Sequence, residues 1–328
     1  MEIHSSPEII EQLKERSAQW LALKQEIKKI VVGQEYVVDR ILIGLICNAH
    51  ILLEGVPGLA KTTLIKTVSQ ALGLDCKRIQ FTPDLLPADL IGTLIYNPKT
   101  QEFQTKKGPI FTHMILADEI NRAPAKVQSA LLEAMQEHQV TISETSYKLE
   151  EPFFVLATQN PIEQEGTYRL PEAQVDRFMF KLVMTYPSLV EEKEMLKKLS
   201  QVNKIDEIIN KEDVIQTQKL MEHVYLDEKV IDYVLALVFA SRNPKAYKLD
   251  DVAHLLEHGA SPRATIAIYQ ASKAHAFLRK RHFVTPDDVK AVAPDILRHR
   301  LLLTYEAEAE SITTDQIIQQ ILRTIPAP

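Results

Sequence analysis

Glycine is the residue type that this sequence most conspicuously lacks. The 328 residues contain nine glycines, whereas an average usage of about 7% would give roughly 23. Eight of them lie at or before Gly166, and only Gly259 lies later in the chain. Because glycine marks turns and close approaches of the backbone to ligands, this distribution predicts a turn-rich, ligand-binding first part and a helical second part.

Cysteines and long apolar runs are also scarce. The two cysteines, Cys47 and Cys76, cannot form a disulfide framework, which favours a reducing compartment. The first residues lack the basic and apolar regions of a signal peptide, and the longest apolar runs are about eight residues, whereas a membrane span needs roughly 20. We therefore expect a cytoplasmic protein that does not insert into a membrane.

The charge balance excludes a strong general attraction to polyanions. Lys and Arg number 38 against 44 Asp and Glu, a formal net charge of −6, so nothing global favours nucleic acid or anionic membranes. The content of 45% hydrophobic and 25% charged residues is typical of soluble globular proteins and excludes disorder. The length allows two or three domains with a large core.

Short apolar segments alternate with helical patterns through the first 187 residues. A helical pattern covers 7–30, and strands are predicted at 50–54, 76–80, 114–118, 152–158 and 178–184. Strands separated by helices predict a doubly wound α/β domain with a parallel sheet, here residues 1–187. The patterns from 188 onward are helical and predict a smaller all-α domain, 188–328. They cover 189–200, 211–223, 227–242, 262–281, 286–303 and 313–323.

Two insertions interrupt the α/β pattern. Residues 81–112 contain four prolines and two glycines and form a long connection, which base rates mark as functional or mobile. Residues 139–151 alternate apolar and polar side chains around a polar tip, a pattern that predicts a β-hairpin. Tyr96, Phe103 and Tyr147 are candidate contact residues in these insertions, with core packing as the equally good alternative.

The segment Gly55–Thr62, with the sequence GVPGLAKT, follows an apolar strand and opens a helix. This is the context of a phosphate-binding loop, in which backbone N–H groups hold phosphate oxygens. Lys61 would add a positive charge at the terminal phosphates, and the Thr62 hydroxyl would ligate Mg²⁺. Ala60 stands where the pattern usually has glycine.

A pair of carboxylates ends the strand at 114–118. The carboxyl end of a parallel strand beside a phosphate loop is where Mg²⁺ finds a further ligand, and Asp118 is assigned to it. Glu119 is assigned as the base that orients and deprotonates water. The alternative is a buried strand that ends in solvated acids.

These residues resemble the AAA+ ATPases, and the MoxR family within them. The resemblance spans nearly the whole chain and rests on GVPGLAKT (55–62), LADEINRAP (116–124), ATQNP (157–161), EGTYRLPEAQVDRF (165–178) and GASPRA (259–264). The first three segments indicate AAA+ membership, and the last two indicate MoxR. Arg169 departs from the pattern, which would favour proline there. The resemblance implies a P-loop AAA+ core, a helical lid, and ATP/ADP with Mg²⁺ as cofactors.

The resemblance also implies further roles for single residues. Asn160 corresponds to the sensor that polarises the attacking water, Arg177 to an arginine finger for a neighbouring subunit, and Arg263 to a second sensor in the lid. The alternatives are a turn residue for Asn160 and a salt-bridged surface arginine for Arg177. The implied nucleotide-binding residues are Gly33, Gln34, Gly55, Val56, Pro57, Gly58, Leu59, Ala60, Lys61, Thr62 and Thr63.

A finger supplied to a neighbour requires a closed ring, and the resemblance implies a hexamer. It further implies remodelling, maturation or metal-cofactor assembly of a client protein, with a partner that carries a von Willebrand factor A domain. The insertions 81–112 and 139–151 correspond to a helix-2 insert and a pre-sensor hairpin. One alternative is a DNA-associated motor, which the net charge disfavours. The other is a nucleotide-dependent regulatory scaffold that does not hydrolyse ATP. It is disfavoured because the chain has the full set of hydrolytic residues: Lys61, Asp118, Glu119, Asn160, Arg177 and Arg263.

Two other patterns invite different interpretations. His254–His258 matches an H-x-x-E-H metalloprotease pattern, but Gly259 follows at once as an expected helix stop, which disfavours zinc catalysis. Residues 279–282 are basic and could contact nucleic acid, although a basic helix end that complements the helix dipole explains them better.

Overall fold

The computed structural model describes residues 6–56, 58–161, 167–168, 170–199 and 204–328. They form two compact units. One contains Ala22–Phe178 and Leu182–Ile215, and the other contains Met1–Leu21, Met179–Lys181 and Gln216–Pro328. We call them the sheet unit and the helical unit.

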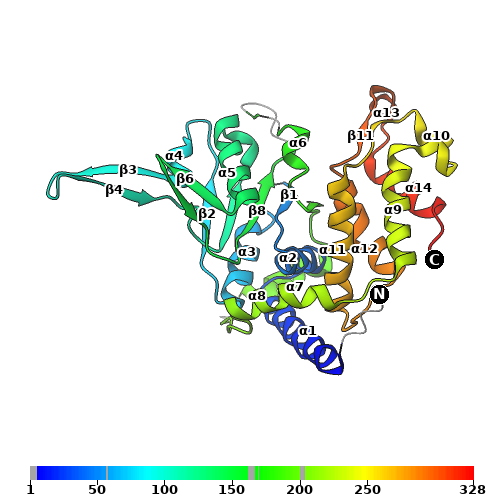
Figure 1. Cartoon of the computed structure of the whole chain (residues 1–328), viewed down its shortest axis with the longest axis horizontal. Helices are drawn as coiled ribbons and strands as arrows, with labels where there is room; N and C mark the ends of the chain where they lie inside the picture. Colours follow the sequence, from blue (N-terminus) through cyan, green and yellow to red (C-terminus); the bar gives the residue numbers. More distant parts are fainter. Residues whose placement is uncertain (1–5, 57, 162–166, 169, 200–203) are drawn as a thin grey trace. The chain divides into compact units, whose positions relative to one another are not determined.

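A five-stranded sheet organises the first of these units (Figure 1). All five predicted strands form, in the spatial order β2-β5-β8-β1-β9, and the β2–β5, β5–β8 and β8–β1 pairs are parallel. The register pairs Gln80 with Asp118, and Glu54 with Gln159, so the carboxyl ends of four strands meet at one edge. The strands are β1 (Ile51–Glu54), β2 (Cys76–Gln80), β5 (Met114–Asp118), β8 (Phe154–Gln159) and β9 (Phe180–Val183).

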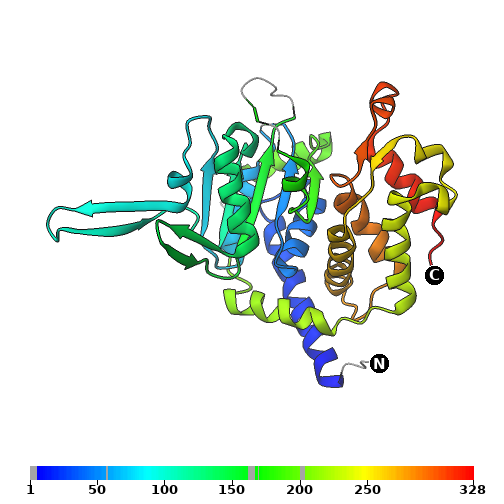
Figure 2. The ribbon, with the colours of Figure 1, turned by 45° about the horizontal axis from the view of Figure 1, so that its top comes forward.

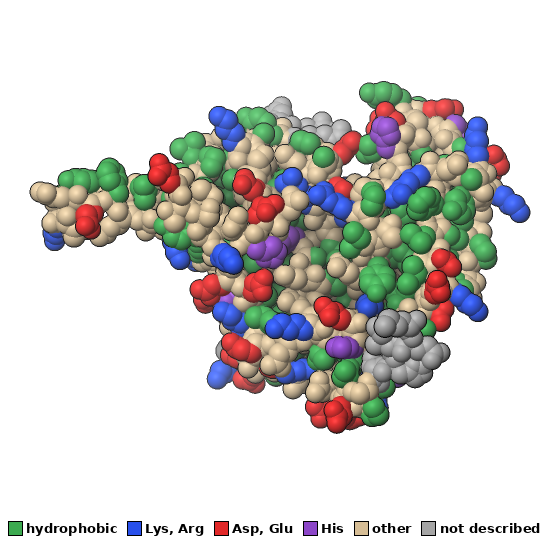
Figure 3. Space-filling view, in the orientation of Figure 1, with side chains coloured by type: hydrophobic (Ala, Val, Ile, Leu, Met, Phe, Trp, Pro, Cys, Tyr) green, Lys and Arg blue, Asp and Glu red, His purple; other side chains and the backbone are tan. Residues whose placement is uncertain are grey.

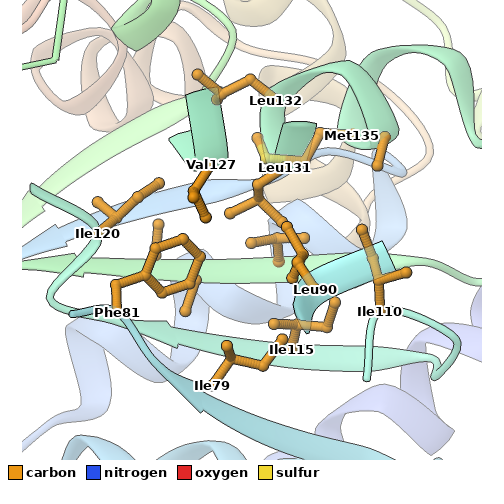
Figure 4. Packing of buried hydrophobic residues seen from close by; sticks show 14 of the residues in the cluster. Ile79, Phe81, Leu90, Ile110, Ile115, Ile120, Val127, Leu131, Leu132 and Met135 are labelled. Carbon is orange, nitrogen blue, oxygen red and sulfur yellow. The ribbon is translucent and has the colours of Figure 1, made fainter. Parts of the chain in front are cut away.

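Helices between the strands bury both faces of this sheet, as a parallel sheet requires. On one face, Phe81 and Ile115 pack with Leu131 of α5 (Figure 4). The alternate residues of the strands, such as Leu116 and Leu156, are also buried. The helices of this part are α2 (Glu35–Ile46), α3 (Lys61–Ala71), α4 (Pro87–Ile91), α5 (Ala125–Glu137), α6 (Glu172–Val175) and α7 (Leu189–Leu199).

The insertion at 81–112 is more regular than the sequence suggested. It contains α4 and an antiparallel hairpin of β3 (Gly92–Asn97) and β4 (Glu102–Lys107), which projects from the sheet unit (Figure 2). The strands meet closely at the base, where a Cβ on Gly92 would lie 2.2 Å from the Lys106 carbonyl oxygen. The alternation of apolar residues before Asn97 and the turn residues after it were the signals for this hairpin.

The second hairpin agrees with its prediction. Strands β6 (Gln139–Ile142) and β7 (Thr145–Lys148) pair antiparallel within the predicted 139–151 segment. The Tyr147 hydroxyl lies 2.9 Å from the Thr105 hydroxyl of β4, and the Lys107 ammonium lies over the Phe111 and Tyr147 rings. Tyr147 therefore joins the bases of the two hairpins.

The helical unit consists mostly of helices around a core of their own. They are α9 (Glu228–Arg242), α10 (Asp250–Ala253), α11 (Pro262–Leu278), α12 (Pro286–Leu297), α13 (Tyr305–Ala309) and α14 (Thr314–Thr324). Helix α8 (Lys211–Leu220) begins in the sheet unit and ends in the helical unit. The unit also contains a two-stranded antiparallel pair, β10 (Leu256–His258) with β11 (Leu302–Leu303). None of the described helices is long and apolar enough to span a bilayer.

The β10 strand explains the H-x-x-E-H pattern. Helix α10 ends at Ala253, so His254 and His258 do not share a helical face. The role expected for Gly259 as a helix stop is wrong, because no helix precedes it directly. Instead the backbone of Ser241 passes so close that a Cβ on Gly259 would lie 2.4 Å from its carbonyl oxygen.

The compact units divide the chain differently from the boundary expected near residue 187. Helix α1 (Pro7–Lys28) begins in the helical unit and continues into the sheet unit. Helix α7 belongs to the sheet unit, where its Lys198 ammonium donates to the Lys28 carbonyl oxygen at 2.8 Å. The division into functional domains 1–187 and 188–328 stays a prediction.

Candidate active site

The loop between β1 and α3 has the backbone of an anion-binding turn. Gly58 and Ala60 both adopt positive φ, at 88° and 55°, and Ala60 is the N-cap of α3. Gly55 allows the loop to pass Met184, since a Cβ there would lie 2.9 Å from the Cβ of that residue. Pro57 lies outside the described residues. The first N–H groups of α3 follow directly, which is the arrangement that binds phosphate.

Lys61 begins α3 and spans this loop. Its ammonium donates to the Gly55 carbonyl oxygen at 2.6 Å. Burial lowers the pKa of Lys61, while the charges of Asp118 and Glu119 act in the opposite direction. The structure thus brings together the predicted cation and both predicted carboxylates. A partly desolvated ammonium at the start of a helix is well placed to bind an anion.

Asp118 is held from two sides at the carboxyl end of β5. Its Oδ1 accepts a hydrogen bond from the Thr158 hydroxyl at 2.6 Å. Its Oδ2 accepts from Arg78 Nε at 3.0 Å and Nη2 at 2.7 Å. Both partners come from the strands adjacent to β5: Thr158 follows Ala157, which pairs with Ala117, and Arg78 on β2 pairs with Leu116, two residues before Asp118. Its orientation is therefore set before any ligand binds.

Glu119 is the first residue beyond β5 and turns sharply, with φ 57° and ψ 49°. Its backbone N–H donates to the Thr158 hydroxyl at 2.9 Å. Its Oε2 accepts from Gln80 Nε2 at 2.7 Å and from Arg122 Nη1 at 3.2 Å. Its Oε1 has no hydrogen-bond partner among the described residues. One oxygen of this carboxylate thus remains able to accept a proton from water.

A cavity of about 490 Å³ adjoins the phosphate loop. The predicted nucleotide-binding residues Gln34, Gly58, Leu59, Ala60 and Thr63 line it. Val32, which precedes the predicted Gly33 and Gln34 in the segment expected to flank adenine, also lines it. The sequence did not predict the other lining residues, which come from the segment after α1, from α3, and from α7 and the residues before it: Lys29, Ile30, Val31, Leu64, Pro187, Met195 and Lys198. Its volume and largely apolar lining suit a nucleotide base and ribose.

Gly33 shapes this cavity without lining it. Its φ is +73°, and a Cβ there would lie 2.8 Å from the carboxyl carbon of Glu191 on α7. Glu191 in turn accepts hydrogen bonds at 2.7 Å from the backbone and hydroxyl of Ser188, at the start of α7. The close contact between the 30–34 segment and α7 therefore depends on glycine at position 33.

The remaining predicted residues lie at element ends. Asn160 is buried directly after β8, next to Gln159, whose carbonyl oxygen accepts from Gly55 N–H at 3.2 Å. Thr62 lies in the first turn of α3, and Val56 in the loop before it. Arg263 is exposed in the first turn of α11, in the helical unit. Gly166 and Arg169 lie outside the described residues.

Arg177 follows α6 in the sheet unit. Its Nε is buried without a hydrogen-bond partner, and its guanidinium forms no ion pair with any described residue. The sequence had left open a salt-bridged surface arginine, and the described part of the chain offers no such salt bridge. The Arg177 guanidinium therefore has capacity for a partner that the described residues do not supply.

The groups that hold the two carboxylates were not predicted from the sequence. Arg78 and Gln80 lie on β2, two residues apart and on the same side of the strand, and Thr158 lies on β8. The signal was present, because a doubly wound sheet brings the ends of neighbouring strands together. Using it required the strand order, which only the structure gives.

The oxygen ligands of this site fit a magnesium ion that binds together with a nucleotide. Among the described residues, no group of three or more His, Cys, Asp or Glu side chains could hold a metal ion. Mg²⁺ characteristically uses one or two protein oxygens and takes its other ligands from phosphates and water. The Thr62 hydroxyl and the Asp118 carboxylate are the residues that would hold it.

Comparison with known proteins agrees with this geometry. The family model described as "ATPase family associated with various cellular activities (AAA)" matches residues 50–180, and the model "AAA lid domain" matches residues 250–321. The crystal structure of a candidate ATPase from Cytophaga hutchinsonii superposes with a TM-score of 0.92 at 51% identity, over 97% of this chain and 98% of that one.

Relatives similar over most of their length narrow the family further. The chain is 47% identical over 304 residues to Chaperone MoxR1 of Mycobacterium tuberculosis, covering 92% of this chain and 81% of that protein. It is 43% identical to the Bacillus subtilis protein YeaC, with 93% of each covered, and 29% identical to Protein MoxR of Methylorubrum extorquens. The chain therefore belongs to the MoxR family of AAA+ ATPases.

Proposed function

We propose that this protein is a Mg²⁺-dependent ATPase that hydrolyses ATP in a ring oligomer and uses the energy to remodel or mature client proteins. One observation carries the proposal: Lys61, Asp118 and Glu119 lie together at the edge of the sheet, beside a cavity of nucleotide size. A module that only binds nucleotide has no need for a carboxylate with an uncommitted oxygen at this position.

In the proposed reaction, water attacks the γ-phosphorus and the bond to the β,γ-bridging oxygen breaks. Glu119 Oε1 accepts the proton of the water, and ADP and phosphate are the products. Lys61 exchanges its bond to the Gly55 carbonyl for the phosphate oxygens. Asn160 orients the water. Bound Mg²⁺ would neutralise charge on the phosphates, held by Thr62 and Asp118.

The ring is supported by Arg177. Its guanidinium, which forms no ion pair with the described residues, is proposed to reach the γ-phosphate bound to a neighbouring subunit. Repetition of this head-to-tail contact closes a ring, which we propose to be a hexamer. Arg263 is proposed as the lid residue that responds to the nucleotide.

The client role is supported by the exposed apolar side chains of the β3–β4 hairpin. The Tyr96 and Phe103 rings contact each other at a tilt of 58°, with centroids 5.4 Å apart, although they are 50% and 68% exposed. Apolar side chains are visible along this hairpin in Figure 3. Exposed apolar clusters mark contact surfaces. We propose a protein client or partner in the cytoplasm, of the type that carries a von Willebrand factor A domain.

A DNA-associated motor has weaker support. Acidic and basic side chains are interspersed on the face shown in Figure 3, and the net charge is −6. Neither favours binding to the phosphate backbone of nucleic acid. DNA that stimulated hydrolysis in a salt-dependent way would reverse this preference.

The Glu119→Gln variant tests the hydrolysis proposal. The glutamine amide oxygen can still accept the hydrogen bond from Arg122, but the amide cannot accept a proton from water. We therefore expect ATP binding within about threefold of wild type and turnover lower by about 100-fold or more. Phosphate release and binding of a fluorescent ATP analogue measure the two effects. The control is Glu133→Gln on α5, an exposed glutamate, which should hydrolyse ATP at the wild-type rate. Wild-type turnover by Glu119→Gln would remove Glu119 as the base.

A further inference from the structure

The Thr158 hydroxyl joins the two acidic residues of the site. It lies 2.6 Å from Asp118 Oδ1 and 2.9 Å from the Glu119 backbone nitrogen. These two residues have been assigned different tasks, one toward the metal and one toward water. A single atom on a neighbouring strand is thus bonded to both.

The chemistry of its partners fixes the direction of both hydrogen bonds. A carboxylate oxygen only accepts, and a backbone N–H only donates. The single hydroxyl hydrogen of Thr158 must therefore point to Asp118, while its lone pair receives the Glu119 N–H. The bond to the carboxylate is charge-assisted, which makes it the stronger of the two.

The threonine itself has little freedom to move. Its side chain is 1% exposed, on β8 between β5 and β1. Threonine branches at Cβ, and this restricts rotation about χ1. The hydroxyl is therefore presented to Asp118 and Glu119 in a fixed position by the core of the sheet, and not by a mobile loop.

Each bond restrains a different degree of freedom. The bond to Oδ1 limits rotation of the Asp118 carboxylate and leaves Oδ2 toward Arg78. The bond from the Glu119 N–H stabilises a left-handed backbone, with φ 57° and ψ 49°, which costs a residue other than glycine about 1 kcal/mol. This backbone conformation directs the Glu119 side chain toward Gln80 and Arg122.

We propose that Thr158 is a positioning residue for hydrolysis, whose hydroxyl sets the orientation of Asp118 toward the metal and the backbone of Glu119 toward water. It touches neither substrate nor metal and acts through these two residues. The inference rests on the proposed function, because it assigns Thr158 a task within that reaction.

Two substitutions separate the hydroxyl from the packing. Thr158→Val keeps the branched shape and loses the hydroxyl, whereas Thr158→Ser keeps the hydroxyl and loses a buried methyl group. We expect Thr158→Val to need about tenfold more Mg²⁺ for half-maximal tightening of nucleotide binding, as supporting hydrogen bonds to metal ligands typically contribute 10- to 100-fold. Its kcat at saturating Mg²⁺ should fall by about tenfold or more. Thr158→Ser should stay within about threefold of wild type in both quantities.

Binding is measured by calorimetry with a non-hydrolysable ATP analogue over a Mg²⁺ titration, so that one readout does not depend on turnover. Thr217→Val is the matched control. Thr217 is also fully buried, and its hydroxyl accepts from Trp20 Nε1 at 3.0 Å in the helical unit. The Thr217→Val variant should lower the midpoint temperature of thermal unfolding without changing the Mg²⁺ concentration needed for half-maximal tightening of nucleotide binding.

A Mg²⁺ requirement and kcat for Thr158→Val equal to wild type would overturn the inference. So would a Thr158→Ser variant as impaired as Thr158→Val, because the methyl packing and not the hydroxyl would then matter. If wild-type protein itself bound no Mg²⁺-nucleotide, the proposed function would fail, which is a result distinct from either of these.

Discussion

Two polar residues at opposite edges of the same parallel sheet differ in how far the described residues supply their partners. At the amino edge, His50 lies just before β1, where its Nδ1 accepts from Val155 N–H at 3.1 Å and its Nε2 donates to the Met135 carbonyl at 3.0 Å. At the carboxyl edge, Glu119 Oε1 has no hydrogen-bond partner among the described residues. The His50 ring, whose partners the chain supplies, stabilises the fold, whereas the free oxygen of Glu119 is available to a ligand.

The largest test asks whether one chain supplies every group of the active site. Lys61→Ala removes the phosphate ligand and Arg177→Ala removes the proposed finger, so each variant alone should lose about 100-fold or more of its turnover. In a 1:1 mixture, about a quarter of the sites would pair an intact Lys61 with an intact Arg177 from the neighbour, if the rings assemble at random. We expect hydrolysis to recover to about that fraction of wild type.

Sedimentation with ATP and Mg²⁺ provides the control, since both variants must still assemble into a large oligomer. A mixture as inactive as its components would contradict a shared site, provided that the subunits exchange. A strictly monomeric wild-type protein with full activity would also contradict it.

The sequence was most informative where the residues of one site are neighbours along the chain. The GVPGLAKT segment carries both its glycines and its lysine within eight residues, and the acids Asp118 and Glu119 directly end a strand, so local pattern was enough to find them. Arg78, Gln80 and Thr158 are distant from these acids in sequence and meet them only through the strand order β2-β5-β8. The β3–β4 hairpin was missed because proline and glycine in 81–112 suggested an irregular loop.

The contribution of His50 at the amino edge can be tested by lowering the pH. Burial lowers the pKa of His50 from 6.5 to about 4. A histidine with a lowered pKa contributes stability above its ordinary value of 6.5, and this is lost as the pH falls toward 4, because the unfolded chain binds the proton first. Over these 2.5 pH units, at about 1.4 kcal/mol each, the free energy of unfolding should fall by about 3 kcal/mol.

Urea denaturation at pH values from 7 to 4.5 measures this loss. Burial also lowers the pKa of His113, which acts in the same direction, whereas the lowered pKa of Glu26 matters only below its ordinary value of 4.5. The control is His50→Gln, whose amide can both donate and accept but does not titrate. Its stability should depend less on pH. An unchanged acid dependence in this variant would mean that His50 is not the source.

The smallest test concerns backbone strain at the carboxyl edge. Ala60 adopts φ 55° and ψ 28°, a conformation that a Cβ makes unfavourable and that glycine adopts freely. Ala60→Gly should therefore raise the free energy of unfolding by about 0.5 to 1 kcal/mol, the relief of strain exceeding the entropy that glycine adds to the unfolded chain. Nucleotide affinity should change by less than about threefold, because the loop keeps its backbone.

An alanine in an ordinary helix provides the matched comparison. Ala22 is exposed within α1, where replacement by glycine should lower the free energy of unfolding by about 1 kcal/mol. The same substitution is thus expected to have opposite signs at the two positions, as measured by urea denaturation. Destabilisation at both would mean that the free protein does not hold Ala60 in the left-handed conformation. Opposite signs would show that the loop holds its anion-binding conformation at a cost in stability. The hydrogen bonds of His50 at the amino edge, in contrast, stabilise the fold.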